Sequence, residues 1–483
     1  MRVCFVTSEC VPYAKTGGLA DVAGSLPKAL SEAGCEVKVV MPLYSSIRTL
    51  DHKLDPSSDL GTMEVDMAGK KVSFTAWYGK LPDSDVDVHF IDCPAYYHRG
   101  ELYTSDPDEA ERFILLQHAA MTIMQRYHWS PDIVHCNDWH TALLPIFLRD
   151  HYSWDGLFNN TASVLTIHNI GYQGRFSPST LQLAGLRSTG FYPGGPYELE
   201  GSFSFLKTGL LYADAITTVS DTYAKEIQTP AYGAGLEQVL RSRERDLYGV
   251  LNGIDLSVWN PSRDDYLERR YTYRSLGRKL QNKRALIEEM RLPFDERVPV
   301  IGVVSRLTPQ KGLELLEPII GAVVSIPAQV VVLGSGESRY EDFFRYAAST
   351  YGESISFYPG YSERLAHRIT AGSDMFLMPS HYEPCGMNQM FSLVYGTVPI
   401  VRKTGGLADT VFDYHEFGGE GNGFSFVDFE SYALHDAIGR ACSLFRNKDA
   451  WLTVQKRGMK EDFSWNRSAS RYLDIYETAK SRH

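Results

Sequence analysis

The chain has 483 residues, which is too long for one compact core and favours two or three domains of ordinary size. Hydrophobic residues make up 43% and charged residues 22%, as in soluble globular proteins, and no apolar run approaches the roughly 18 residues of a membrane span. The net charge of −11 disfavours nucleic acid as a bulk partner, although a local basic pocket for one small anion is still compatible with it.

The N-terminus and the cysteines indicate the compartment. The opening MRVCFVTSE turns polar too early for a signal-peptide core and reads as a first buried strand. Seven cysteines without a CxxC pair argue against a disulfide framework or a zinc site and favour a reducing cytoplasm. With no transit extension ahead of that strand, we expect a bacterial cytoplasm rather than a plastid, and no membrane partner.

Short apolar strands, glycine-bearing turns and amphipathic helices alternate along the first half of the chain. The sequence predicts strands over 2–8, 36–41, 132–138 and 162–168, and a helix over roughly 20–33 that stops at Gly34. The last two strands end in polar residues. In doubly wound sheets ligands sit at the carboxyl ends of the strands, so these tips are candidate ligand sites.

The same alternation restarts in the second half. Buried strands are predicted over 298–306, 328–336, 354–360, 374–380 and 397–402, with helices over 362–372 and 386–395 among them. A polar stretch at 242–265 separates the two series. The sequence therefore predicts an α/β fold of two Rossmann-like, doubly wound domains that face a deep cleft. The expected bounds are 1–246 and 247–462, followed by a C-terminal helix over 463–483 that crosses back to the first domain.

Two cations lie close together in SRLTPQKG, directly after a predicted strand. Arg306 ends the strand and Lys311 follows on the same loop. Arginine can hold two oxygens through its planar fork, whereas lysine acts as a point charge. Cations near a helix start are unfavourable without an anion, so the pair favours a diphosphate site over two ordinary surface charges.

A second turn, HYEPCGMNQM, follows the strand predicted over 374–380. Glu383 sits on this turn, Pro384 stiffens it, and Gly386 precedes a helix whose free N–H groups suit a phosphate. A carboxylate here can bond a sugar hydroxyl or face positive charge that develops at a reacting carbon. The alternative is a glutamate that merely caps the helix.

The heptapeptide KTGGLAD occurs twice, at 15–21 and at 403–409. In the first copy, Gly17 and Gly18 permit close backbone approach to a ligand and Lys15 supplies charge. The loop lacks the GxGxxG of dinucleotide-binding folds, so an NAD-dependent oxidoreductase is disfavoured. For the second copy, a ligand site and a simple turn into a helix stay equally open.

Polar residues at the first domain's strand tips complete the candidate site. His168 and Asn169 end one strand, and the run 137–140, which holds Asp138 and Trp139, offers an indole face and hydroxyl partners that suit a sugar chain. A metal pair is formally possible at Asp83 and Asp85, or at Asp85 and Asp87. These lie in a turn and an alternating, edge-like strand, so solvent-facing carboxylates are favoured and no metal is expected.

The ordered set of motifs resembles the bacterial glycogen synthase and plant starch synthase family, which uses ADP-glucose. The motifs, in chain order, are KTGGLADV, HCNDWH, TIHNIGYQG, VLNGID, SRLTPQKG, YEPCGMNQM and YGTVPIVRKTGGLADTV. The resemblance implies the two-Rossmann-domain (GT-B) fold, with closure around the donor. It also implies retention of anomeric configuration, with neither a metal nor pyridoxal phosphate as cofactor. The expected partners are ADP-glucose and an α-1,4-glucan, either glycogen or maltooligosaccharides.

The resemblance also assigns roles. Lys15 and Gly18 would contact the donor phosphates from the first domain, with Arg306 and Lys311 holding them from the second. Tyr361 would stack on adenine. The residues expected around the glucosyl unit are His168, Asn169, Asn252 and Glu383, with backbone contacts from Cys385 and Gly386. Asp138, Trp139 and Tyr97 would orient the acceptor.

One departure from the family pattern concerns the donor site. Met387 and Asn388 stand where the family often has Leu-Thr; because the expected contacts there are backbone N–H groups, little loss is expected. Three alternatives remain: a GT-B transferase that uses UDP-glucose or another nucleotide sugar, a phosphorylase, and a non-catalytic glucan-binding scaffold. The chain is much shorter than glycogen phosphorylases, and the joint presence of Arg306, Lys311 and Glu383 argues against the scaffold.

Overall fold

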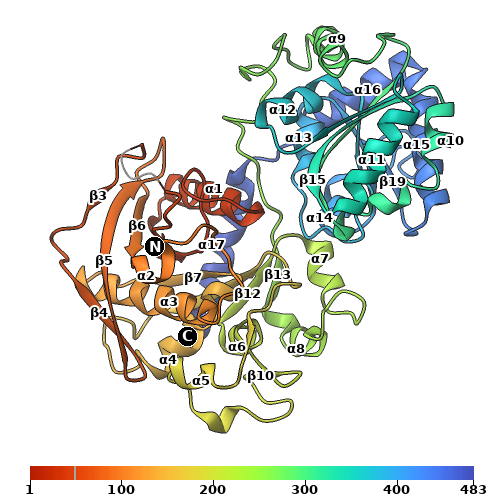
Figure 1. Cartoon of the computed structure of the whole chain (residues 1–483). Helices are drawn as coiled ribbons and strands as arrows, with labels where there is room; N and C mark the ends of the chain where they lie inside the picture. The colour runs from red at the N-terminus through yellow and green to blue at the C-terminus, as the bar shows by residue number, and fades with distance from the viewer. Residues whose placement is uncertain (48–50) are drawn as a thin grey trace. The chain divides into compact units, whose positions relative to one another are not determined.

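A computed structural model describes residues 1–47 and 51–483, which form two compact α/β units (Figure 1). Unit 1 comprises Met1–Gly253 and Trp465–His483, and unit 2 comprises Ile254–Ser464. The first boundary lies later than the predicted one at 246. The reason is that β13 (Leu247–Gly249) pairs in parallel with β12 (Ala215–Thr218) and so completes the sheet of unit 1.

Unit 1 is built on a mixed sheet with the strand order β13-β12-β8-β7-β1-β2-β6-β5-β3, and β4 pairs with β5. The remaining strands are β1 (Arg2–Val6), β2 (Glu36–Pro42), β3 (Asp55–Pro56), β4 (Met63–Met67), β5 (Lys70–Lys80), β6 (Asp87–Asp92), β7 (Ile133–Asn137) and β8 (Ala162–Ile167). The ladder is parallel from β13 to β6. Every residue of β7 and β8 is buried, as expected for parallel strands covered on both faces.

The segment 85–92 corrects one expectation. It was predicted as an edge-like strand, but β6 lies inside the sheet, parallel to β2 and antiparallel to β5. The first polar residue of β6 finds partners there, since Asp87 accepts hydrogen bonds from Lys38 (2.9 Å) and Tyr78 (2.8 Å).

The helices of unit 1 include the last helix of the chain. They are α1 (Gly18–Glu32), α2 (Pro94–Tyr97), α3 (Glu109–Arg126), α4 (Leu144–Asp150), α5 (Thr180–Leu183), α6 (Phe205–Tyr212), α7 (Asp221–Glu226), α8 (Glu237–Ser242) and α17 (Trp465–Arg482). The C-terminal α17 contacts α1, β8 and β12, and its Tyr476 hydroxyl lies 2.6 Å from Nδ1 of His135 on β7. A small antiparallel sheet is formed by β9 (Arg175–Phe176), β10 (Glu198–Leu199) and β11 (Ser202–Ser204).

Unit 2 is a parallel sheet with the order β16-β15-β14-β17-β18-β19. Its strands are β14 (Val300–Leu307), β15 (Gln329–Gly336), β16 (Ile355–Pro359), β17 (Met375–Met378), β18 (Val398–Arg402) and β19 (Phe424–Phe426). Its helices are α9 (Lys279–Glu289), α10 (Ile320–Ser325), α11 (Ser338–Thr350), α12 (Glu363–Gly372), α13 (Asn388–Val394), α14 (Gly405–Thr410), α15 (Ser431–Phe445) and α16 (Lys448–Gly458).

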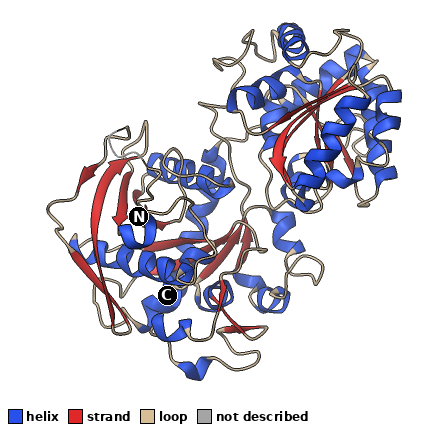
Figure 2. Cartoon of the chain, in the orientation of Figure 1, coloured by secondary structure: helices blue, strands red, loops and turns tan. Residues whose placement is uncertain are grey.

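Helices cover both faces of this second sheet (Figure 2). Because successive strand side chains point to opposite faces, Val330 and Val332 belong to one core cluster with α11 and α15. Val331 and Leu333 belong to another with α9 and α12. This two-sided burial confirms the predicted doubly wound organisation, and the cleft between the domains stays a prediction.

Two further features complete the fold. The chain crosses from one unit to the other twice, after Gly253 and after Ser464. The two crossings are neighbours, since the Ile254 N–H donates to the Phe463 carbonyl at 2.8 Å. Over residues 1–47 and 51–483, none of the helices is both long and apolar enough to cross a membrane.

Candidate active site

In unit 2 an ion pair links the loop after β14 to the turn after β17. The Lys311 ammonium lies 2.7 and 3.0 Å from the two carboxylate oxygens of Glu383, and the Ser380 hydroxyl donates to the same carboxylate at 2.9 Å. Glu383 is only 6% exposed. The structure thus brings together two residues that the sequence predicted separately.

The backbone holds these two loops together. The His381 N–H donates to the Gln310 carbonyl at 2.9 Å. Gly312, which follows Lys311, has a φ of +64°, and a Cβ there would lie 2.0 Å from the carbonyl oxygen of Pro379. Only glycine fits this close approach, so the register between the Lys311 loop and the end of β17 is fixed.

The other predicted donor-site residues of unit 2 gather at the same carboxyl edge of the sheet. Arg306 is exposed at the end of β14, and its guanidinium forms no ion pair with any residue that the structure describes. Tyr361 follows β16 and is 75% exposed. The Asn388 side chain donates to the Val304 carbonyl at 2.8 Å, so it fastens the start of α13 to β14. Cys385 is buried and Gly386 has a φ of +68°, with partly exposed Met387 next in the chain.

In unit 1 the predicted residues lie at the carboxyl ends of adjacent parallel strands. His168 follows β8, and its Nε2 lies 2.9 Å from Oδ1 of Asn137 at the end of β7. Since the Asn137 amide NH₂ donates to the Val6 carbonyl, its oxygen faces the ring, so Nε2 carries the proton and Nδ1 is an acceptor. Burial lowers the pKa of His168 to about 3, which keeps the ring neutral.

Asp138 organises the same corner through its side chain. Its carboxylate accepts from the main-chain N–H of His168 at 2.7 Å and of Asn169 at 3.5 Å. Asp138 is buried, with a φ of +55°. Burial raises the pKa of Asp138 to about 7, against the lowering effect of the two N–H donors.

The glycine loop of unit 1 is held by Glu9, a residue that the sequence analysis missed. Glu9 is 4% exposed, and its carboxylate accepts from the N–H groups of Thr16 (2.6 Å) and Gly17 (3.0 Å) and from the Thr16 hydroxyl (2.7 Å). The exposed Lys15 pairs with Asp21 at 2.7 Å, and Gly18 begins α1. Glu9 lies just after β1. The expectation that ligands sit at the carboxyl ends of the strands, which pointed to His168, could therefore have pointed to Glu9 as well.

Tyr103 joins this loop to the strand tips. Its hydroxyl donates to Glu9 at 2.6 Å and lies 2.8 Å from the Ser8 hydroxyl. Its ring stacks on His140, with centroids 4.7 Å apart. Nothing in the local sequence of Tyr103 marks this role, because it sits in an irregular loop.

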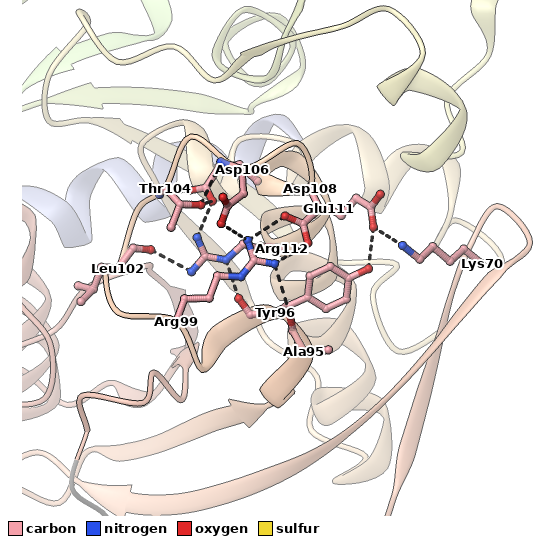
Figure 3. Close-up of polar contacts among 11 residues, drawn as sticks. Lys70, Ala95, Tyr96, Arg99, Leu102, Thr104, Asp106, Asp108, Glu111 and Arg112 are labelled. Carbon is pink, nitrogen blue, oxygen red and sulfur yellow. Dashed lines mark hydrogen bonds and ion pairs between the residues drawn. The ribbon is translucent and has the colours of Figure 1, made fainter.

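Two arginines anchor the loop that carries Tyr103 (Figure 3). The fully buried Arg112 donates to the carbonyls of Tyr96 (2.7 Å) and Leu102 (3.0 Å) and pairs with Glu109 (2.5 Å). Arg99 binds Asp106 at 2.8 Å and also pairs with Asp108. A guanidinium with several acceptors can fix an irregular loop, because its planar donors constrain direction as well as distance.

Two aromatic residues that the sequence predicted at the acceptor are buried in this structure. Tyr97 is fully buried, and its hydroxyl donates to the Arg112 carbonyl at 2.7 Å, so it offers no surface to an acceptor. Trp139 is 9% exposed and packs against Phe113 and Phe176, so the expected open indole face is absent. The tyrosine that reaches the strand tips is Tyr103.

Two further predictions can be placed. Asn252, beyond β13, is 6% exposed, and its Oδ1 is buried without a hydrogen bond to any described residue. A buried oxygen without a hydrogen-bond donor needs an explanation, and a donor group on a bound ligand would supply one.

Asp83 and Asp85 are exposed in the turn before β6, as expected for solvent-facing carboxylates. Among residues 1–47 and 51–483, no group of three or more histidine, cysteine or acidic side chains is arranged to hold a metal ion.

Two family models match the two halves of the chain. The family described as the starch synthase catalytic domain matches residues 2–242, and glycosyl transferases group 1 matches residues 287–448. A glycogen synthase of Desulforudis audaxviator is 44% identical, covering 100% of this chain and 97% of the relative. One of Thermotoga maritima is 43% identical, covering 100% and 99%.

A solved structure of the catalytic domain of starch synthase IV from Arabidopsis thaliana, bound to ADP and acarbose, is 32% identical. It superposes with a TM-score of 0.91 over 99% of each chain. A sucrose-phosphate synthase of Thermosynechococcus elongatus, 17% identical with a TM-score of 0.60, shares the fold alone. The chain is a glycosyltransferase and belongs to the glycogen and starch synthase family.

Proposed function

We propose that the protein transfers glucose from ADP-glucose to the non-reducing end of an α-1,4-glucan, with retention of configuration and without a metal or pyridoxal phosphate. Family membership supports glucan synthesis, and the starch synthase IV relative was solved with ADP, which supports adenine as the donor base. The observation that carries the proposal is the Lys311–Glu383 pair, together with the exposed Arg306 at the same carboxyl edge of the sheet of unit 2.

Arg306 and Lys311 bind the donor diphosphate in this account. Lys311 has three N–H donors, and the two Glu383 oxygens lie within reach of them, so one donor stays available for a phosphate oxygen. The exposed guanidinium of Arg306 can hold two phosphate oxygens through its fork. Both cations stabilise the negative charge that grows on the leaving ADP, which is the charge a metal ion neutralises in many other phosphate sites. Tyr361, exposed after β16, stacks on the adenine.

Glu383 faces the glucosyl carbon as an electrostatic partner. Its carboxylate accepts from Lys311 and Ser380, and a carboxylate held at this point stabilises positive charge developing at C1. The C1–oxygen bond to ADP breaks as the acceptor 4-hydroxyl bonds to C1 from the same face. The hydroxyl proton passes to the departing phosphate oxygen.

Unit 1 supplies neutral hydrogen-bonding groups for the sugar. The Nδ1 atom of His168 is an acceptor for a sugar hydroxyl, and Asn169 and Asn252 contribute amide groups. Lys15 and Gly18 approach the donor phosphates from the glycine loop. Asp138, which fixes the main chain at His168, orients the acceptor by shaping the strand tips.

Nucleotide release in the presence of glycogen tests this function. ADP-glucose and UDP-glucose are supplied in parallel reactions, each with and without a chelator. Glycogen-dependent ADP release that survives the chelator is the expected result. UDP release alone would overturn the donor, loss of turnover with the chelator would overturn metal independence, and no release from either donor would favour a non-catalytic glucan-binding protein.

A further inference from the structure

We propose that Gly405 and Gly406, in the second copy of KTGGLAD, are positioning residues that hold Glu383 in place through backbone contact. The inference rests on the proposed role of Glu383. It assigns a task to the second copy, which the sequence left open between a ligand site and a simple turn. The copy begins directly after β18, and its glycines open α14.

The two glycines lie against the main chain of the Glu383 turn. A Cβ on Gly405 would stand 1.9 Å from the carbonyl oxygen of Glu383, and one on Gly406 would stand 2.0 Å from that of Cys385. Real Cβ–oxygen contacts exceed about 3 Å, so either alanine must displace the turn or α14 by roughly an ångström. Gly405 also has a φ of +44°, which disfavours any side chain there.

Hydrogen bonds make the same connection. The Gly406 N–H is shared between the carbonyls of Glu383 (3.2 Å) and Pro384 (3.1 Å). The Thr410 hydroxyl donates to the Gly406 carbonyl at 2.6 Å. Gln389, which is fully buried, donates to the Thr410 hydroxyl at 3.2 Å and to the Cys385 carbonyl at 3.1 Å. The turn, α13 and α14 therefore form one bonded unit.

The first copy is built differently although its seven residues are identical. Gly17 has a φ of −147°, and a Cβ there would meet nothing within 4 Å. Its N–H bonds to the side chain of Glu9, whereas Gly406 bonds to the main chain of Glu383. The close fit is thus a property of the second copy's surroundings and not of the heptapeptide.

The location of the contact explains its effect on chemistry. Glu383 is held from its side chain by Lys311 and Ser380 and from its main chain by the glycine pair. A shift of about an ångström at a reacting group can cost about a hundredfold in rate, because the charge no longer faces the reacting carbon. Binding of the glucan depends on unit 1 and is not altered by this shift.

A double-mutant cycle on the full chain tests the inference, with the variants Gly405→Ala, Glu383→Gln and their combination. Gly439→Ala on α15 is the matched control, since a Cβ there meets nothing within 4 Å. In the wild-type background, we expect Gly405→Ala to lower kcat about 10- to 100-fold while the KM for glycogen stays unchanged. In the Glu383→Gln background, we expect the same substitution to lower kcat less than about threefold. Wild-type kcat in Gly405→Ala, or the same loss in both backgrounds, would overturn the inference.

Two further measurements cover folding and the underlying function. If the glycine variants fail to fold, Thr410→Val and Thr410→Ser test the inference instead. A several-fold lower kcat in Thr410→Val, with wild-type kcat in Thr410→Ser, supports the inference. An unchanged kcat in both variants overturns it. A crystal structure of the folded alanine variant, or of Thr410→Val in its place, must show Glu383 displaced relative to the wild type, and an unmoved Glu383 overturns the inference. If the wild-type protein shows no turnover, the proposed function is refuted instead. The crystal structure of the variant would then still test whether the glycine pair holds the position of Glu383.

Discussion

Lys311 and Glu383 form a partly buried pair in which one ammonium lies 2.7 and 3.0 Å from the two oxygens of a carboxylate that is only 6% exposed. The two residues are brought together because their loops follow adjacent parallel strands, β14 and β17. In the proposed function, the pair pre-organises a negative group for the glucosyl unit and a positive group for the diphosphate at one sheet edge. This relationship is the basis of the first prediction.

Replacement of Lys311 by alanine should lower kcat roughly 10²- to 10³-fold, because the charge that develops on ADP loses its nearest cation. The KM for glycogen should stay within about twofold of the wild type, since the acceptor residues lie on unit 1. Steady-state kinetics with Lys71→Ala as the control checks this, because Lys71 forms an exposed pair with Glu64. A large rise in the KM for glycogen at unchanged kcat would contradict the assigned role.

Asp138 should make the protein less stable as the pH rises. Burial raises the pKa of Asp138 to about 7 from a usual value of 3.8, so between these values the folded state holds a proton that the unfolded state has lost. Stability from this group is therefore full below about pH 4 and declines until about pH 7. Urea denaturation at pH 5 and pH 8 should show a larger decline for the wild type than for Asp138→Asn, by on the order of a few kcal/mol. Equal declines would show that Asp138 does not titrate in this range.

Tyr97→Phe should leave the kinetics intact and cost stability. The change removes a buried hydrogen bond to the Arg112 carbonyl, which contributes about 1 kcal/mol to the free energy of unfolding. The KM for maltooligosaccharides should not change. Tyr432→Phe on the exposed face of α15 serves as the control, since its hydroxyl bonds only at the surface. A raised KM for maltooligosaccharides in Tyr97→Phe would instead support the predicted contact between Tyr97 and the acceptor.

Tyr361→Ala should raise the KM for ADP-glucose about tenfold, because stacking of one base on an aromatic ring contributes about 1–3 kcal/mol. Tyr346→Ala on α11 is the matched control, since Tyr346 is 65% exposed while Tyr361 is 75% exposed. Direct titration with ADP should show the same loss for Tyr361→Ala. Unchanged affinity for ADP would mean that the adenine binds elsewhere.

Regular periodicity made most of the fold predictable. The strands that the sequence predicted lie close to their observed bounds, because buried parallel strands are short apolar runs between glycine-bearing turns. The strands β3, β4, β5, β12, β13 and β19 were not predicted. The unit boundary was placed too early, since β13 is a three-residue strand whose apolar content is too small to recognise. The position of β6 inside the sheet depends on strand order, which local pattern does not encode.

The candidate site was predictable where residues lie at strand tips and not elsewhere. Glu383 and His168 follow strands directly, and the sheet brings each to a carboxyl edge. Tyr103 was missed because its contact with Glu9 depends on a loop fixed by distant arginines. The two copies of KTGGLAD show the limit most clearly, because identical residues place Gly17 in open space and Gly405 against Glu383.

Transfer of labelled glucose from ADP-glucose to glycogen, followed by digestion with β-amylase, tests the central claim most directly. That enzyme removes maltose from the non-reducing ends of α-1,4-linked chains. The account predicts that the wild type incorporates label, that digestion releases nearly all of it as maltose, and that Glu383→Gln incorporates far less. Absence of incorporation, or incorporated label that resists digestion, would contradict retaining transfer to a non-reducing end.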